Sequence, residues 1–283
     1  MEIEMAQDSA HAQIRIEPRS PSYWRIIIDN PPFNIFGPDT MPQLNAVVSA
    51  LETDPHVKVV VFESAVPGFF LTHYDFVPPL EATTSMPPGP TGLPPLPDML
   101  VRLGRTSVIS IAKIRGRATG VGSELALASD MRFASNEGTL LSQWEIGAAL
   151  VPGGGPMTRL SRMIGRGRAL EVLVSGNDID GPLAERYGYV NRSFPDNELD
   201  DFVDALATRI ASFDKQSLAA IKQQVNTQTL PPDSAVAPEW DAFIASVGRP
   251  AAQEKISQLM ELGLQKNHDV EARLGYYTGT LWR

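Results

Sequence analysis

Hydrophobic residues follow two alternating patterns along the first two thirds of the chain. Short runs of consecutive apolar, mostly β-branched residues predict buried strands over 23–29, 57–63, 108–116 and 131–135. Between the first two runs, apolar residues from Met41 to Leu51 recur at steps of three and four, which predicts an amphipathic helix. Strands that alternate with helices predict an α/β fold with largely parallel strand pairing.

The pattern becomes helical from about residue 196. Four segments with helical spacing are separated by Pro, Asp or Gly, and they cover 198–213, 215–226, 238–248 and 251–265. We therefore expect an α/β core over 13–195 and a helical region over 196–283. Residues 1–12 are acidic and lack an apolar centre, so we expect a flexible N-terminus rather than a signal peptide.

A proline-rich segment interrupts the core between the second and third predicted strands. Residues 77–97 contain eight of the 24 prolines in the chain. Proline disrupts helix interiors and strand ladders. We therefore expect a long surface loop insertion here, either a lid over a site or a mobile segment.

Composition narrows the classes of function. A net charge of −9 argues against nucleic acid as the main partner, because phosphate binding needs a basic surface. The chain has no cysteine, which excludes thiol nucleophiles, disulfides and Cys-based zinc sites, and its four histidines are too scattered to predict any metal site. No stretch approaches the 18 consecutive apolar residues of a membrane helix. We expect a cytoplasmic protein with no membrane partner.

Two glutamates are the best candidates for acid–base chemistry. Glu124 follows the glycine-rich stretch ATGVGS, and Glu145 lies beside Trp144 in LLSQWEIGAAL. Burial in such apolar sequence would raise a carboxyl pKa and suit it to proton transfer, and a loop bare of side chains would offer backbone N–H groups to an oxyanion. The residues alone also allow a charge–dipole contact for Glu124 and a structural ion pair for Glu145.

Longer stretches resemble a known family. FNIFGPDTMPQLNAVVSALETDPHVKVVVFES, GFFLTHYDF, RGRATGVGSELALASD, LSQWEIGAALVPGGGP and GRALEVLVSGNDIDGPLAERYGYVNRSF are similar in order and spacing to the enoyl-CoA hydratase/isomerase (crotonase) superfamily, from about residue 13 to 230. The resemblance implies a spiral of ββα units with a C-terminal helical trimerisation region. It implies a homotrimer or a dimer of trimers (a hexamer) and a role of the kind found in fatty acid metabolism. It also implies no permanently bound cofactor, with coenzyme A as part of an acyl-CoA substrate.

The family's site can be carried onto this chain residue by residue. The backbone N–H groups of Tyr74 and Val121 then form an oxyanion hole that stabilises a thioester enolate. Glu145 serves the α-carbon, and Glu124 activates the water that is added at the β-carbon. Because family isomerases commonly keep only the second acid, the presence of both favours hydration or dehydration over isomerisation. The further pocket residues are His73, Asp75, Phe76, Gly122, Trp144, Pro152 and Gly153.

The chain departs from the family at the pocket. THYD, residues 72–75, stands where the family usually has AGAD, so that His73 replaces a glycine and Tyr74 adds a large ring. Val121 replaces another usual glycine and Trp144 a residue that is commonly proline, which predicts a narrowed acyl pocket. His73 is either a surface or backbone-bonded histidine or an additional acid/base.

The expected function is therefore an enoyl-CoA hydratase/dehydratase or isomerase that works through an enolate. Two alternatives remain open. One is a crotonase-fold hydrolase that cleaves the carbon–carbon bond of a cyclic β-diketone without coenzyme A and uses His73 as the base. The other is a non-catalytic scaffold.

Overall fold

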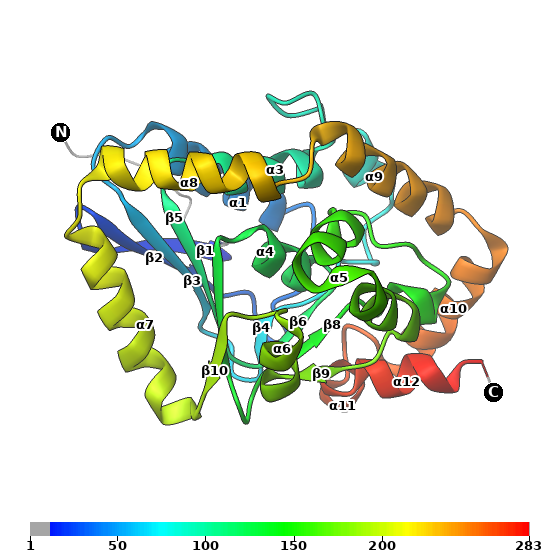
Figure 1. Cartoon of the computed structure of the whole chain (residues 1–283). Helices are drawn as coiled ribbons and strands as arrows, with labels where there is room; N and C mark the ends of the chain where they lie inside the picture. Colours follow the sequence, from blue (N-terminus) through cyan, green and yellow to red (C-terminus); the bar gives the residue numbers. More distant parts are fainter. Residues whose placement is uncertain (1–11, 283) are drawn as a thin grey trace.

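Two β-sheets form the centre of the fold, and helices surround them (Figure 1). The computed structural model describes residues 12–282, so nearly all of the N-terminal segment expected to be flexible, 1–12, lies outside the described residues. The larger sheet has the strand order β1-β2-β3-β5-β7-β10, and the smaller sheet has the order β4-β6-β8-β9. Their bounds are Ile14–Ser20 (β1), Tyr23–Ile28 (β2), Val59–Ser64 (β3), Phe69–Leu71 (β4), Ile109–Ile114 (β5), Arg117–Thr119 (β6), Met131–Ser135 (β7), Leu140–Ser142 (β8), Ile179–Asp180 (β9) and Arg192–Phe194 (β10).

The chain alternates between the two sheets as it advances. β3, β5 and β7 join the larger sheet, while β4, β6 and β8 join the smaller one, so each pair of strands adds one turn to a spiral. Pairing is parallel except for β1 with β2 and β8 with β9. The expected α/β spiral of ββα units is therefore confirmed.

Helices fill the connections of the spiral and make up the chain from residue 196 onward. Among the described residues they are Thr40–Thr53 (α1), Glu81–Thr84 (α2), Pro95–Arg105 (α3), Val121–Ala128 (α4), Pro156–Ser175 (α5), Gly181–Tyr187 (α6), Asp196–Ala211 (α7), Lys215–Thr229 (α8), Asp233–Val247 (α9), Pro250–Leu262 (α10), His268–Ala272 (α11) and Leu274–Thr280 (α12), with a 3-10 turn at Glu145–Ala148 (η1). None of them is long and apolar enough to cross a membrane.

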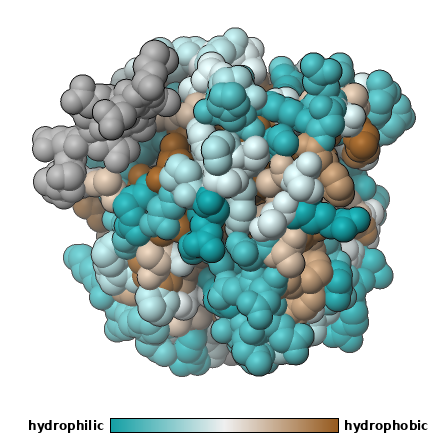
Figure 2. Space-filling view, turned by 90° about the vertical axis from the view of Figure 1, so that its left-hand side faces the viewer, coloured by the Kyte–Doolittle hydropathy of each residue, from teal (hydrophilic) through white to brown (hydrophobic). Residues whose placement is uncertain are grey.

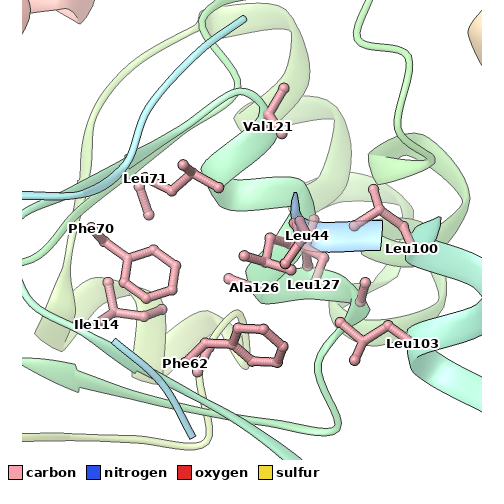
Figure 3. Close-up of a cluster of buried hydrophobic side chains, with 14 of the residues drawn as sticks. Leu44, Phe62, Phe70, Leu71, Leu100, Leu103, Ile114, Val121, Ala126 and Leu127 are labelled. Carbon is pink, nitrogen blue, oxygen red and sulfur yellow. The ribbon is translucent and has the colours of Figure 1, made fainter. Parts of the chain in front are cut away.

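Helix α4 lies at the centre of the main hydrophobic core. All eight of its residues are buried, because its alanines and leucines meet side chains from both sheets and from α1 and α3. Figure 3 shows Ala126 and Leu127 of α4 among these neighbours, with Val121 at the start of the helix. The labelled neighbours are Leu44, Phe62, Phe70, Leu71, Leu100, Leu103 and Ile114. This packing fixes the position of the N-terminus of α4.

A separate hydrophobic cluster lies on the opposite face of the larger sheet, under α7. Helix α7 packs Leu199, Val203 and Ala207 against Val61 and Phe133 of that sheet. Figure 2 views the molecule from the side on which α7 and α8 lie in Figure 1, and its surface there is mainly hydrophilic, with hydrophobic atoms in small separate patches.

The predicted proline-rich loop is more regular than expected. One turn of helix, α2, lies within 77–97, and α3 begins at Pro95. Helix α3 tolerates its prolines because the first N–H groups of a helix have no intrahelical partner. The Asp98 side chain accepts hydrogen bonds from the N–H and hydroxyl of Thr91, at 2.8 and 2.6 Å, and this ties the loop to α3.

Helix α9 also differs from its prediction. It starts at Asp233, five residues before the predicted 238–248, and Pro238 lies inside it. The loss of one intrahelical hydrogen bond at Pro238 is tolerated because the same helix buries Val236, Glu239 and Trp240.

Candidate active site

The N-terminus of α4 lies against the chain that leaves β4. The N–H of Gly122 donates to the carbonyl of Thr72 at 3.2 Å. Any Cβ at residue 122 would overlap the Leu71 carbonyl oxygen, so only glycine permits this approach. The contact sets residues 72–74 beside residues 120–122, and both segments line one cavity.

Two backbone N–H groups at this junction have no acceptor in the part of the chain that the structure describes. Phe36 donates its N–H to the carbonyl of His73 and accepts the N–H of Asp75, at 3.0 and 2.7 Å, so the N–H of Tyr74 points away from Phe36. Val121 is the first residue of α4, where no intrahelical acceptor exists. Within residues 12–282, neither N–H donates to any protein acceptor. The geometry fits the oxyanion hole that the family resemblance assigns to Tyr74 and Val121.

Glu124 is buried one turn into α4. Its Oε1 accepts the N–H of Gly154 at 2.7 Å, and any Cβ at residue 154 would overlap its carboxyl group. Burial raises the pKa of Glu124 to about 7, although the Gly154 hydrogen bond opposes the shift. A carboxyl group with that pKa can both take and give a proton near neutral pH.

Glu145 lies at the start of η1 and is also buried. Burial, followed by the charge of Glu124, raises its pKa well above the usual range. Its Oε2 has no hydrogen-bond partner in the described chain, and neither has the indole Nε1 of the adjacent Trp144. A Cβ on Gly120 would lie 2.8 Å from Glu145 Oε1 and 3.1 Å from Trp144 Nε1, so the carboxyl and the indole N–H lie close together. A buried donor and a buried acceptor without partners favour an oxygen-containing ligand at this point.

The cavity between the two acids is small and mostly apolar. Its volume is about 20 Å³, which is room for about one water molecule. Of the predicted pocket residues, His73, Phe76, Trp144 and Gly153 line it together with both glutamates, Tyr74 and Val121. The wall is completed by four residues that no sequence motif marks: Leu96, Leu150, Trp240 and Phe243.

Three predicted pocket residues do not line the cavity. The Asp75 carboxylate points to the C-terminal segment, where it accepts Gln265 Nε2–H at 2.6 Å. Gly122 is packed against Leu71, and Pro152 is buried just before Gly153. Gly122 therefore shapes the site through its backbone, which lies close to Leu71. The Asp75 carboxylate instead connects its loop to Gln265 in the C-terminal segment.

His73 is buried, with both ring nitrogens in hydrogen-bonding contacts. Nδ1 lies 2.8 Å from the carbonyl oxygen of Tyr74, and Nε2 lies 3.1 and 3.2 Å from the two carboxyl oxygens of Glu271 in α11. The ring also packs 5.3 Å from that of Trp144. A surface position for His73 is wrong, while a backbone contact is confirmed. Glu271 was missed because nothing in a sequence links positions 198 residues apart.

Two buried charged side chains, Arg159 and Glu239, hold the glycine-rich loop that carries Gly154. Buried Arg159 donates to the Gly154 carbonyl at 2.6 Å. Glu239 of α9 accepts the N–H groups of Met157 and Thr158, at 3.0 and 2.8 Å, at the start of α5. The hydrogen-bond partner of Glu124 is thus fixed from two sides.

Comparisons with known proteins identify the family of this chain. A family model described as enoyl-CoA hydratase/isomerase matches residues 20–244. The chain belongs to this family. A probable enoyl-CoA hydratase of Mycobacterium tuberculosis is 30% identical over 223 residues, which are 74% of this chain and 75% of that protein. A short-chain-enoyl-CoA hydratase of Clostridium acetobutylicum is 29% identical over 213 residues, 74% of this chain and 80% of the other.

Solved structures of the enoyl-CoA hydratase/isomerase family have the same fold. A provisionally named enoyl-CoA hydratase from Streptomyces avermitilis is 36% identical, with a TM-score of 0.90 over 97% of this chain and 99% of that one. An enoyl-CoA hydratase from Mycobacterium avium subsp. paratuberculosis, 23% identical, matches with a TM-score of 0.78 over 87% of this chain and 98% of its own. The latter likeness concerns the fold alone.

Proposed function

We propose that this chain is an enoyl-CoA hydratase, which adds water to the α,β double bond of an enoyl thioester of coenzyme A or removes it in reverse. One observation carries the proposal: two buried glutamates with raised pKa values line a cavity together with Tyr74 and Val121, whose backbone N–H groups have no protein acceptor among the described residues. Coenzyme A is here part of the substrate, and the proposal requires no resident cofactor.

In the proposed mechanism, the thioester oxygen accepts the N–H groups of Tyr74 and Val121. These donors stabilise the enolate that forms when water adds at the β-carbon, and loss of one such donor costs about 2.7–4 kcal/mol in comparable acyl chemistry. Because the donors are backbone groups, the Tyr74 and Val121 side chains do not prevent the interaction.

The two acids divide the proton transfers. Glu124, with a pKa of about 7, is partly ionised at neutral pH and accepts a proton from the attacking water. Burial raises the pKa of Glu145 well above the usual range, which favours its protonated form, and in this mechanism Glu145 delivers its proton to the α-carbon. The water oxygen ends on the β-carbon and its second hydrogen stays in the new hydroxyl group. The free Oε2 of Glu145 and the Trp144 N–H support the binding of an oxygen group between them.

The structure weakens one alternative. A diketone hydrolase that uses His73 as its base needs a free ring nitrogen. Here, Nδ1 contacts the Tyr74 carbonyl, and Nε2 contacts Glu271. Isomerisation needs only one acid, whereas both Glu124 and Glu145 line the cavity.

A panel of enoyl-CoA thioesters tests the proposal. Hydration is followed as loss of the ultraviolet absorbance of the conjugated thioester, and the product is identified by mass. Glu145→Gln keeps the shape of the side chain but removes the titrating group, and we expect the rate to fall about 10²–10⁴-fold. Glu261→Gln, at an exposed position on α10, is the matched control. A product that shifts its double bond without gaining water would identify an isomerase, and turnover of cyclic β-diketones alone would refute the hydratase.

We also propose that the protein self-associates as a trimer or hexamer. Ile146 and Val174 are large apolar side chains that are 42 and 63% exposed. Ile146 packs against Gly176, which follows Val174 by two residues at the end of α5. An exposed apolar group of this kind favours a protein contact. Light scattering after size exclusion gives the mass in solution, and a monomer at micromolar concentration would contradict this proposal.

A further inference from the structure

The His73 side chain forms a bridge between the candidate oxyanion hole and α11. A carbonyl oxygen only accepts hydrogen bonds, so Nδ1 of His73 carries a proton and donates it to Tyr74 O. Nε2 faces both oxygens of Glu271. Glu271 Oε1 also accepts the N–H of Gln265 at 2.7 Å, which favours the ionised carboxylate. An ionised carboxylate only accepts, so Nε2 must carry a proton as well, and the ring is an imidazolium ion.

The surrounding charges favour this ion pair. Around the ring lie Asp75 on the same loop and Glu271 on α11, with Arg117 of β6 acting on Glu271. Burial alone lowers the pKa of His73, but the charge and hydrogen bond of Glu271, with help from the Tyr74 carbonyl and Asp75, raise it above its usual value overall. Burial likewise raises the pKa of Glu271, yet the His73 charge and the Gln265 hydrogen bond leave it lowered overall.

The bridge acts on the backbone that presents the Tyr74 N–H. The peptide before Tyr74 is held by Phe36 N–H, which donates to His73 O at 3.0 Å. The peptide after Tyr74 is held twice, by Asp75 N–H donating to Phe36 and by the His73 ring donating to Tyr74 O. The Tyr74 N–H belongs to the first of these two peptides, so with both peptides held its orientation is fixed, away from Phe36.

We propose that His73 is a positioning residue, whose imidazolium is held by Glu271 and both orients the Tyr74 N–H and places a positive charge behind the oxyanion hole. The catalytic part of this inference rests on the proposed hydratase function. The charge state and the ion pair do not depend on that function.

The second anchor of the same loop strengthens the inference. Gln265 donates Nε2–H to Asp75 at 2.6 Å and accepts the N–H of Phe76 at 3.1 Å. Gln265 and Glu271, which are joined by their own hydrogen bond, therefore hold residues 73–76 from the same C-terminal segment.

The first test is independent of activity. In protein labelled with ¹⁵N at histidine, His73→Gln assigns one of the four ring signals. We expect His73 to show two protonated nitrogens at pH 7, because the Glu271 carboxylate raises the pKa of the His73 ring above its usual value. In Glu271→Gln, which keeps the shape but not the charge, the His73 titration should move to lower pH. A neutral His73 ring at pH 7 in the unmodified protein would overturn the ion pair, whatever the enzyme's substrate proves to be.

The second test uses the hydration assay once turnover is established. Glu271→Gln and His73→Asn should each lower kcat about 10- to 100-fold, less than complete loss of an oxyanion donor, with KM changed little. His73→Asn should retain more activity than His73→Ala, because an amide can still donate to Tyr74 O. The alkaline limb of the pH profile should move to lower pH in Glu271→Gln, because loss of the pair makes His73 deprotonate earlier. His56→Asn is the control. Unchanged kcat and an unchanged alkaline limb in folded Glu271→Gln would refute the positioning role.

Discussion

Burial of the Glu124 carboxyl should lower the stability of the folded protein near neutral pH, where this group can exchange protons. Its pKa is about 7 in the folded protein against an ordinary value of 4.5. Because the folded value is raised, the folded state binds the proton more tightly than the unfolded state does. Stability is then highest below about pH 4.5, falls as pH rises toward 7, and changes little from this group above pH 7. The gap between the two values corresponds to about 3 kcal/mol.

Glu124→Gln removes this pH dependence and keeps a side-chain oxygen that can accept the N–H of Gly154. At pH 4 the variant and the unmodified protein should have nearly equal free energies of unfolding. At pH 8 the variant should be more stable by about 3 kcal/mol. The loss of the charge next to Glu145 acts in the same direction, since that charge contributes to the raised pKa of Glu145.

Urea denaturation at pH 4, 6 and 8, followed by tryptophan fluorescence at one protein concentration, measures the difference. A fixed concentration is needed because any subunit association adds to the apparent stability. Glu261→Gln, at an exposed position on α10, is the control variant. A Glu124→Gln variant that is equally stable relative to the unmodified protein at pH 4 and pH 8, or less stable at pH 8, would refute the desolvation argument. The same variant should be nearly inactive at every pH.

Three further predictions concern the walls of the site. Trp144→Phe removes a buried N–H that has no partner among residues 12–282, so turnover should fall about 10-fold while the melting temperature changes little. Steady-state kinetics and calorimetry check both, and unchanged turnover would exclude a substrate contact. Trp240→Ala should enlarge the cavity of about 20 Å³, lower stability by about 3–5 kcal/mol and increase the relative rate with longer acyl chains, as measured with a chain-length series. Gly122→Ala would place a Cβ against the Leu71 carbonyl and should abolish activity and lower the melting temperature. The control Gly167→Ala, with open space around it, should stabilise α5 by about 0.5–1 kcal/mol in thermal unfolding.

The longer elements of the fold could be predicted from hydrophobic spacing. The strands β2, β3, β5 and β7 and the helices α1, α7, α8 and α10 lie within a few residues of the expected segments. The three-residue strands β4, β6 and β8 are too short to show a period, yet they build the second sheet and so define the spiral. Their partner strands lie on other turns of the spiral, so the pairing leaves no pattern in the local sequence.

The candidate site was predictable where glycine motifs mark it and hidden where distant segments complete it. Around Gly122 and Glu124, small residues followed by an apolar run indicate a close backbone contact before a buried helix. The structure has that geometry. Trp240 and Phe243, in contrast, reach the cavity only because α9 passes over it. Glu271 carries no motif, and its significance depends on the fold that brings it to His73.

The contact between His73 and Glu271 also has a consequence for the order of events during synthesis. A ribosome that has produced the whole ββα spiral has still not produced residue 271. Until that residue has left the exit tunnel, the His73 ring would lack the carboxylate that keeps it protonated, and the loop that carries the Tyr74 N–H would lack its C-terminal anchor. The nascent chain should therefore acquire its fold before its catalytic competence. A partly made copy would then turn over substrate more slowly than the complete protein.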